Sequence, residues 1–528
     1  MNRKIIRRRT LAIISHPDAG KTTLTEKLLL YGGALALAGS VTSKKNQRAT
    51  TSDWMELEKT RGISISSTVL QFDYNGYRFN LLDTPGHKDF SEDTYRVLMA
   101  VDSVIMVIDA AKGIEAQTVR LFEICKKRKI PIMTFINKLD RPAKAPFELI
   151  DQIEQVLGLK AFPVNWPIES GQNFKGIYDR MDKKVHLFDR MPGGTYKAPF
   201  SVHDITDPAF KNILNETSYE NFIEEVNMLD YAHVEFNQEE VLSGDLTPVY
   251  FGSASNNFGI ELILNGFLEH SNPPSARSTI SGKLIATDSP IFSAFVFKIQ
   301  TNMNPMHRDR MVFARICSGK FHRDLKVFQT RTGKEVRLSS AHNIFGNERE
   351  TIDESFAGEI IGFVTNTDFK IGDTLSSDPT IVLERIPRFA PELFAKITNL
   401  NTSKYKAFRK GIDQLLAEDI VQPFQLDGHN DVIPLLGALG NLQFEVLQYR
   451  LKDEYGVDTR LELMPWTALR WINTAIDNEK LKSILPYGAR LGKDDHNKQV
   501  IFFEDAWRCT MFKDKHQDIE LLDFLIEF

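Results

Sequence analysis

The segment Ser15-His-Pro-Asp-Ala-Gly-Lys-Thr22 carries residue types that bind phosphate groups. It matches the pattern G-x-x-x-x-G-K-[ST] except at the first position, where Ser15 replaces glycine. In this pattern the backbone N–H groups at the start of a helix bind phosphate oxygens, the lysine reaches the β- and γ-phosphates, and the threonine hydroxyl ligates Mg²⁺. Gly20 would let the backbone approach the phosphates closely. The alternative interpretation is a chance Gly-Lys-Thr at the start of a helix.

A second candidate is Asp83-Thr-Pro-Gly86-His87, which follows an apolar run and would lie where a strand ends. Asp83 could hold Mg²⁺ through a water molecule, and the N–H of Gly86 could contact a γ-phosphate. His87 could orient the water that attacks the phosphate, as a glutamine does in Ras-like GTPases. Two alternatives are an ordinary Asp-Thr-Pro-Gly turn and a histidine that caps the following helix.

The segment Asn137-Lys-Leu-Asp140 contains residues suited to recognising a base. The carboxylate of Asp140 can accept hydrogen bonds from the N1–H and N2–H₂ groups of guanine, and adenine does not present these two donors. Asn137 would tie this loop to the phosphate loop, and Gly252-Ser253-Ala254 would offer a backbone N–H to guanine O6. Asparagine and aspartate are also common helix N-caps, which is the alternative interpretation. The three motifs in this order predict a guanine-nucleotide site.

The sequence around these motifs predicts the elements that position them. Four apolar runs are expected to be strands, and the stretches between them have helical spacing. Strands that alternate with helices indicate a mostly parallel sheet covered on both faces. The expected strands are 9–14, 78–82, 103–108 and 131–136, and the expected helices are 23–31, 92–100, 115–128 and 146–157.

The rest of the chain has a different character. Short strand-like runs rich in Phe and Asn follow residue 160, the strand–helix pattern then resumes, and a Pro/Ser-rich stretch is expected to be a linker. A later region rich in β-branched strands predicts a small β-barrel, and helices and strands mix after it. The Phe- and Asn-rich region is 160–245, the resumed strand and helix are 247–252 and 260–270, and the linker is 272–282. The β-barrel is expected over 288–378, and after it a strand at 394–397 with helices at 404–419 and 440–454.

Composition limits the class of protein. The 528 residues are 42% apolar and 26% charged, which allows several domains and excludes a disordered chain, a fibrous repeat and a small disulfide scaffold. The 65 basic and 70 acidic residues give a net charge of −5, which neither suggests nor excludes a nucleic-acid partner. Cys125, Cys317 and Cys509 are far apart, so no disulfide framework or cysteine-rich metal site is expected. No membrane span or export signal is expected either.

Residues 52–65 resemble the first switch of the translational GTPases. In that family a Thr or Ser after Arg-Gly-Ile completes the Mg²⁺ shell, so the resemblance assigns this role to Ser64. It also makes His87 the catalytic residue, positioned by RNA of the large ribosomal subunit. Pro17 stands where elongation relatives carry Val or Ile, the residue that gates the histidine together with Ile63.

Later segments narrow the resemblance within this superfamily. The long interval between Asp140 and Ser253 is typical of the elongation-factor-G branch. Residues 309–338 and 357–375 resemble its second-domain barrel, and the run from Asn441 to Val457 resembles the helix–strand unit of its third domain. The phosphate loop, Ser64 and the Leu442–Leu451 run resemble those of the class-II peptide chain release factors of bacteria, and the resemblance to this family covers nearly the full length of the chain.

That resemblance implies an α/β P-loop GTPase domain over 1–278 with an inserted subdomain at about 160–245, a β-barrel domain over 279–380 and a C-terminal α+β domain over 381–528. It implies a GTPase of translation termination that uses GTP/GDP and Mg²⁺ and removes class-I release factors from the ribosome after peptide release. The expected partners are the ribosome and class-I release factors, without a membrane, and the protein is expected to be a cytoplasmic monomer off the ribosome. Alternatives are an elongation or ribosome-protection GTPase, a P-loop kinase or ATPase, and a guanine-binding scaffold without hydrolysis.

The expected site has two parts. The metal ligands are Thr22, Ser64 and Asp83, and the catalytic residue is His87. The residues expected to contact the nucleotide are Ser15, His16, Pro17, Asp18, Ala19, Gly20, Lys21, Thr22, Thr23, Asp83, Thr84, Pro85, Gly86, His87, Asn137, Lys138, Asp140, Ser253 and Ala254.

Overall fold

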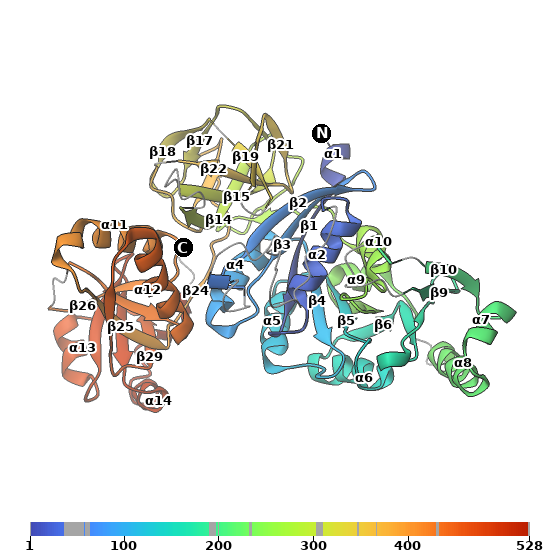
Figure 1. Ribbon diagram of the computed structural model, residues 1–528. Coiled ribbons are helices and arrows are strands. Elements are labelled where there is room, and N and C mark those ends of the chain that lie inside the picture. Colours follow the sequence, from blue (N-terminus) through green and yellow to red (C-terminus); the bar gives the residue numbers. More distant parts are fainter. Residues whose placement is uncertain are drawn as a thin grey trace.

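The computed structural model contains three groups of elements (Figure 1). The N-terminal group comprises the elements from α1 to α10, the barrel group those from β14 to β23, and the C-terminal group those from β24 to β33. The short strands β12 (Arg277–Ser278) and β13 (Leu284–Ile285) lie in sequence between the first two groups and pair with each other. The structure describes residues 2–35, 57–58, 64–189, 197–198, 200–231, 235–302, 310–339, 341–345, 348–365, 367–428 and 432–525.

A seven-stranded sheet forms the centre of the N-terminal group, in the order β2-β3-β1-β4-β5-β11-β6. Every neighbouring pair is parallel except β2 with β3. The inner strands are continuous apolar runs because both of their faces are covered. The strands are β1 (Arg8–Ser15), β2 (Thr68–Tyr74), β3 (Tyr77–Asp83), β4 (Ser103–Asp109), β5 (Ile132–Asn137), β6 (Lys160–Pro163) and β11 (Leu246–Phe251).

Helices cover both faces of this sheet, as the sequence predicts. Side chains of β1 alternate between two cores: Leu11 and Ile13 pack in the core of α2 and α10, and Ala12 and Ile14 pack in the core of α4, α5 and α6. The helices are α2 (Lys21–Tyr31), α4 (Ser91–Ala100), α5 (Ala116–Lys127), α6 (Pro146–Leu157) and α10 (Ile260–His270), with the 3-10 turn η1 (Lys88–Phe90) before α4.

The region expected to be an insert departs from the expectation in two ways. Residues 160–163 form β6 of the main sheet, paired with β11, and the separate sheet begins only at β7. A run of four residues is too short to reveal its partner by periodicity. The region also contains helices where only strands are expected. The elements are β7 (Asn165–Ile168), β8 (Gly176–Asp179), β9 (Lys184–Phe188), β10 (Phe200–Asp204), α7 (Pro208–Ile213), α8 (Glu216–Tyr231) and α9 (Gln238–Ser243).

The barrel group is a curved antiparallel sheet in the order β18-β17-β23-β14-β15-β22-β19-β20, with β16 paired to β21 beside it (Figure 1). Its core includes Ile5 of the N-terminal helix α1 (Asn2–Ile6), an element that the sequence analysis does not expect. The strands are β14 (Ser293–Thr301), β15 (Arg310–Ser318), β16 (Lys320–His322), β17 (Leu325–Gln329), β18 (Lys334–Leu338), β19 (Ala341–Phe345), β20 (Glu348–Ile352), β21 (Glu354–Phe356), β22 (Ile360–Val364) and β23 (Thr374–Ser376).

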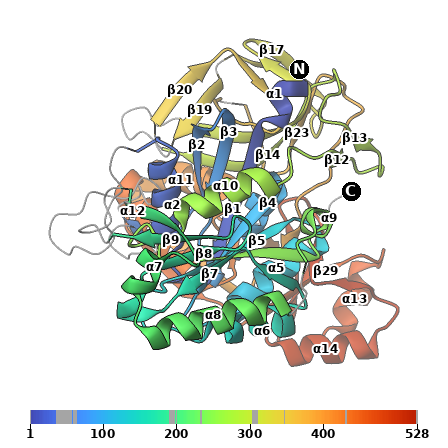
Figure 2. The same ribbon diagram turned by 90° about the vertical axis from the view of Figure 1, so that its right-hand side faces the viewer.

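The C-terminal group has an antiparallel sheet in the order β28-β25-β27-β26-β30-β31-β29-β32 and a separate pair, β24 with β33 (Figures 1 and 2). Helices α11 and α12 contribute to one core, and α13 and α14 to another. The elements are β24 (Arg388–Phe389), β25 (Leu393–Asn399), α11 (Tyr405–Ala417), β26 (Gln422–Leu426), β27 (Leu435–Ala438), α12 (Asn441–Tyr455), β28 (Thr459–Leu463), β29 (Ala468–Ile472), α13 (Asn478–Ile484), β30 (Arg490–Asp494), β31 (Gln499–Phe503), α14 (Ala506–Lys515), β32 (Leu521–Leu522) and β33 (Phe524–Leu525).

Buried polar contacts join the N-terminal group to the barrel group. The carboxylate of Asp102, just before β4, forms an ion pair with the guanidinium of Arg315 in β15, and both side chains are buried. The carboxylate of Glu359 lies 2.9 Å from the guanidinium of Arg8. The Nε2 of Gln71 donates a hydrogen bond of 2.9 Å to the carbonyl of Ile360. These contacts fix the barrel against one edge of the main sheet.

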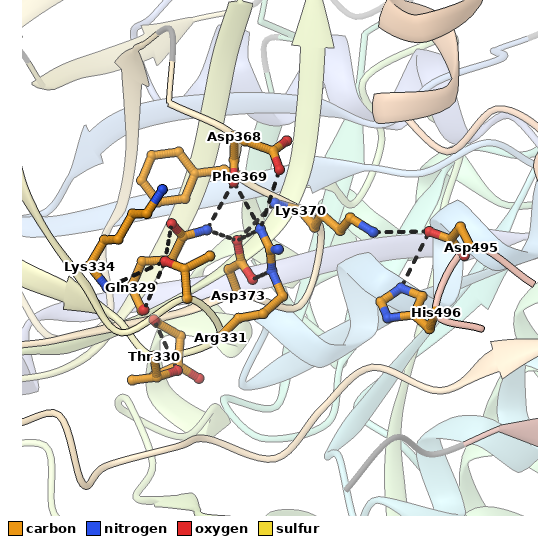
Figure 3. A network of polar contacts seen from close by, with 12 residues as sticks. Gln329, Thr330, Arg331, Lys334, Asp368, Phe369, Lys370, Asp373, Asp495 and His496 are labelled. Atoms are coloured by element: carbon orange, nitrogen blue, oxygen red, sulfur yellow. Dashed lines mark hydrogen bonds and ion pairs between the residues drawn. The ribbon is translucent and has the colours of Figure 1, made fainter. Parts of the chain in front are cut away.

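The C-terminal group contacts both of the others. Arg96 of α4 forms an ion pair with Asp419, and the backbone N–H of Thr301 in β14 donates to the Oε1 of Glu418 at 2.8 Å. In the barrel group, Asp373 accepts hydrogen bonds from the backbone N–H of Lys370 and from the side chains of Gln329 and Arg331 (Figure 3). The Nζ of Lys370 lies 3.1 Å from the Oδ2 of Asp495 in the C-terminal group. All three interfaces therefore contain polar contacts.

Two sequence expectations concern cysteines and membranes. Cys125, Cys317 and Cys509 are buried and unpaired. Within the described ranges, no helix combines the length and the apolar character that a membrane crossing requires.

Candidate nucleotide site

The phosphate loop connects the end of β1 to the start of α2. Gly20 has a φ of +96° at the N-cap of α2, a conformation that favours glycine, and a Cβ on Gly20 would also overlap the Nδ2 of Asn137. Asp18 has a φ of +65°. Ser15 is the last residue of β1 and does not have a positive φ. The first position of the motif therefore does not require glycine here.

The second motif lies beside this loop because β1 and β3 are parallel neighbours. Their register pairs Ile13 with Asp83, so both strands end at the same edge of the sheet. The Nζ of Lys21 forms a buried ion pair with the Oδ1 of Asp83. The Oγ1 of Thr84 donates a hydrogen bond of 2.7 Å to the carbonyl of Ile13. Gly86 also approaches the phosphate loop, since a Cβ built on it would lie 3.6 Å from the Cα of Pro17.

His87 lies just beyond this contact and is partly exposed, with one third of its side chain accessible. It is the N-cap of η1, and its Nδ1 accepts a hydrogen bond of 3.2 Å from the backbone N–H of Asp89. His87 thus caps the following helical turn, which was the alternative role considered from the sequence, and the cap occupies only the Nδ1 of the ring. Within the described ranges, Nε2 has no hydrogen-bond partner. Ile63, the second residue of the gate in elongation relatives, lies outside the described residues.

The base motif connects three loops through the carboxamide of Asn137, the last residue of β5. Its Nδ2 donates to the carbonyl of Ala19 at 2.9 Å, and its Oδ1 accepts from the backbone N–H groups of Ala254 and Lys138, each at 2.8 Å. The Nζ of Lys138 forms an ion pair of 2.8 Å with Asp109, the last residue of β4. These contacts hold the phosphate loop and the loop after β11 at a fixed separation.

Asp140 is half-buried and faces the loop after β11. Its Oδ1 accepts a hydrogen bond of 2.6 Å from the Oγ of Ser253, and its Oδ2 accepts a longer one of 3.4 Å from the Oγ of Ser255. An ionised carboxylate has about four acceptor sites, so it can still accept hydrogen bonds from a base. Sequence reasoning missed Ser255 and Asp109. The signal for Asp109 is its position at the end of an apolar strand, which Asp83 shares.

Two titratable groups beside the loop have shifted pKa values. Burial lowers the pKa of His16, an effect that the nearby carboxylate of Glu115 partly offsets, with 3.5 Å between the His16 Nε2 and the Glu115 Oε2. Burial acts to raise the pKa of Asp109, but hydrogen bonds from Lys138 and the backbone N–H of Ala111 outweigh it and lower that pKa. The neighbourhood therefore favours a neutral His16 and an ionised Asp109.

The expected residues come from separate elements but lie at one edge of the sheet. Ser15 ends β1, Lys21, Thr22 and Thr23 form the first turn of α2, and Asp83 and Asn137 end β3 and β5. Ser64 is half-buried in the chain segment that leads into β2. Hydroxyl and carboxylate oxygens, as on Thr22, Ser64 and Asp83, are the ligand type that Mg²⁺ prefers, so the donor set fits that ion.

Comparisons with known proteins match this architecture along the chain. The family model "Elongation factor Tu GTP binding domain" matches residues 6–273, "Elongation factor G domain 2" matches residues 291–378, and "Class II release factor RF3, C-terminal domain" matches residues 383–513.

Two relatives of similar length carry the same name. A protein from Gloeobacter violaceus called "Peptide chain release factor 3" is 52% identical over 515 residues, which cover 97% of each chain. A protein of the same name from Trichodesmium erythraeum is 48% identical and covers 98% of this chain and 95% of its own. A crystal structure from Thermus thermophilus has a TM-score of 0.68 at 21% identity, covers 92% of this chain and 72% of its own, and supports the fold alone.

The GTP-binding model, the release-factor model and full-length relatives near 50% identity agree with the domain architecture described above. The α/β domain that binds guanine nucleotides, the β-barrel domain and the C-terminal α+β domain expected from the sequence are all confirmed. The chain belongs to the peptide chain release factor 3 family and is a release-factor GTPase.

Proposed function

We propose that GTP binds along the carboxyl edge of the main sheet, with its phosphates in the 15–22 loop and its base beside Asp140. The observation that carries this proposal is the Asn137 carboxamide, which is hydrogen-bonded both to the phosphate loop and to the loop after β11. Because this bridge fixes the distance between the two half-sites before the ligand arrives, less ordering is needed on binding. The hydroxyl of Ser253 orients the Asp140 carboxylate toward the guanine N1–H and N2–H₂ groups.

The phosphates would replace Asp83 as the partner of Lys21. The buried Lys21–Asp83 ion pair keeps the ammonium at the mouth of the loop, where it can move to the β- and γ-phosphates. Asp83, Thr22 and Ser64 are then the residues that would hold Mg²⁺. When bound, that ion supplies positive charge against the charge that develops on the γ-phosphate.

His87 is proposed to orient the attacking water through Nε2. Its Nδ1 accepts the N–H of Asp89, so in the neutral ring the proton lies on Nε2, on the opposite side of the ring. Ribosome-stimulated GTP hydrolysis requires an acceleration of about 10⁵-fold, equivalent to about 7 kcal/mol. A single oriented histidine supplies less than this, so large-subunit RNA is proposed to hold the ring in its reactive position.

The release-factor family places this hydrolysis at the end of translation. The proposed partners are the ribosome and a class-I release factor, which the protein removes after peptide release in the cytoplasm. The proposed functional units are residues 1–278, 279–380 and 381–528. GTP-dependent order around the nucleotide would change the contacts between these units, and a difference of a few kcal/mol between nucleotide states is enough for such a switch.

The departure of a labelled class-I factor from post-termination ribosomes tests this function. We expect the protein with GTP to accelerate departure, and we expect no acceleration with GDP. An unchanged departure rate with GTP would reject the release-factor role in favour of another ribosomal GTPase, such as an elongation or ribosome-protection factor. Hydrolysis measured in the same reactions separates this result from an inactive preparation.

A further inference from the structure

A single buried carboxylate lies between the proposed catalytic histidine and the C-terminal group. Asp89 is in η1, two residues after His87, and its side chain is 5% exposed. Its Oδ1 lies 3.3 Å from the Nδ1 of His87, the same nitrogen that accepts the Asp89 backbone N–H. Its Oδ2 accepts a hydrogen bond of 3.0 Å from the backbone N–H of Leu442. Asp89 therefore binds the ring through its backbone N–H and the C-terminal group through its carboxylate.

The partner of Asp89 is the N-terminus of a helix. Leu442 is the second residue of α12, whose first N–H groups have no partner within the helix and favour a negative charge. Gly440, the N-cap, makes the approach possible because a Cβ at that position would overlap the Asp89 carboxyl group. The φ of Gly440 is −163°, so glycine is required here for space and not for its backbone conformation.

An apolar cluster surrounds this contact. Phe90 of η1, Ile65 and Val446 of α12 are buried together, and Leu442 packs against them. Ile65 is adjacent to the proposed metal ligand Ser64, and Phe90 follows Asp89 directly. One face of α12 thus packs against chain segments next to both the proposed metal ligand and the proposed catalytic histidine.

We propose that Asp89 is a positioning residue for His87, and that it holds the ring in place only while α12 is docked. The inference rests on the proposed catalytic role of His87. Its physical basis is that the Asp89 backbone N–H holds the unprotonated Nδ1 of the ring, whereas the Asp89 carboxylate is fixed by the backbone N–H of Leu442 in α12. The carboxylate makes no hydrogen bond to this unprotonated nitrogen and acts by fixing η1, the turn that carries the N–H. If the C-terminal group moves, the carboxylate loses its buried partner, and η1 loses the contact that fixes its position. The rate of hydrolysis then depends on the docking of the C-terminal group.

A double-mutant cycle in single-turnover GTP hydrolysis on ribosomes tests this. Asp89→Ala removes the carboxylate, and Gly440→Ala disturbs the same contact from the α12 side without altering the nucleotide site. Both are expected to slow hydrolysis by about 10- to 100-fold, the cost of a misplaced catalytic group, while the Kd for GTP stays unchanged. In a His87→Ala background, Asp89→Ala is expected to cause no further loss, because the two residues act as one unit.

Lys370→Met is the matched control. It removes the contact of Lys370 with Asp495, between the barrel group and the C-terminal group (Figure 3). The contacts of Lys370 do not include His87 or Asp89. We expect its hydrolysis rate to stay within about twofold of the unmodified protein, the usual range for independent sites. An equal loss in Lys370→Met that also occurs in the Asp89→Ala background would mean that C-terminal docking affects hydrolysis by a route other than Asp89, and this would overturn the specific role of Asp89.

Two further results separate the inference from the proposal on which it rests. If His87→Ala slows stimulated hydrolysis severely but Asp89→Ala leaves it within about twofold, or slows the residual rate of the His87→Ala background by the same factor, the positioning role is wrong and the catalytic role stands. If His87→Ala retains stimulated hydrolysis, the catalytic role of His87 fails and the inference fails with it. An unchanged Kd for GTP in each variant demonstrates that the nucleotide site is folded.

Discussion

The Nδ2 of Asn137 donates a hydrogen bond of 2.9 Å to the carbonyl of Ala19, although 118 residues separate them along the chain. This contact joins the end of β5 to the phosphate loop, and the Oδ1 of the same side chain accepts the N–H of Ala254. One amide therefore links the loop proposed to bind the phosphates to the loop proposed to bind the base.

Replacing this amide should weaken nucleotide binding. Asn137→Ala leaves a buried carbonyl at Ala19 and a buried N–H at Ala254 unpaired, at a cost of about 1–3 kcal/mol each. Asn137→Asp is the matched variant, because it retains an acceptor for Ala254 and loses the donor to Ala19. In calorimetric titration, the affinity for GDP should be highest for the unmodified protein, lower for Asn137→Asp and lowest for Asn137→Ala. Equal affinities in all three would contradict the bridging role.

The base preference should follow Asp140. Asp140→Asn replaces one acceptor oxygen with an NH₂ donor, which suits the C2 carbonyl of xanthine and opposes the N2–H₂ group of guanine. We expect GTP affinity to fall by at least about 100-fold and XTP affinity to rise, since two charge-assisted hydrogen bonds are lost. Ser253→Ala removes only the hydroxyl that orients Asp140, and it should weaken binding while retaining the guanine preference. Competition binding with GTP, XTP and ATP measures both effects. An unchanged preference in Asp140→Asn would reject the base assignment.

The stability of the interface between the N-terminal and barrel groups should depend on Asp102. Its loss leaves the buried guanidinium of Arg315 without this carboxylate, and removing one partner of a buried pair costs about 3–5 kcal/mol. Glu354→Gln is a suitable control, because Glu354 pairs with Lys4 at the surface, where ion pairs contribute about 0–1 kcal/mol. The melting temperature of Asp102→Ala should therefore be clearly lower than that of Glu354→Gln. Similar melting temperatures for the two variants would show that the buried Asp102–Arg315 pair does not stabilise this interface.

Stability should depend on pH through His16. Burial lowers its pKa from the ordinary value of 6.5, so the unfolded chain binds this proton more readily than the folded one. The contribution of His16 to the free energy of unfolding is therefore fully present above pH 6.5, and it is lost as the pH falls from 6.5 toward the lowered pKa of the folded state. His16→Asn removes this contribution, and its melting temperature should fall less than that of the unmodified protein between about pH 7.5 and about pH 5.5. Parallel curves for the two proteins would contradict a buried neutral His16.

Much of the fold could be predicted because its signals are local. The four apolar strands and the helices between them have their own periodicity, and the observed elements begin and end within a few residues of the expected ranges. The nature of β6 could not be predicted, since its four residues become a strand of the main sheet only by pairing with β11. The helices of the insert were missed for a related reason: α8 buries only one narrow face, and its polar residues obscure the pattern.

The sequence by itself predicted the chemistry proposed for the protein, because motifs for phosphate, metal and guanine recognition consist of residue types at fixed short spacings. Only the tertiary structure decided which of these residues touch, as with Lys21 and Asp83, and which unexpected residues join them, as with Asp109 and Ser255. It alone placed Asp89 against the N-terminus of α12, because 353 residues separate Asp89 from Leu442, and no local pattern encodes a contact formed by the packing of two distant units.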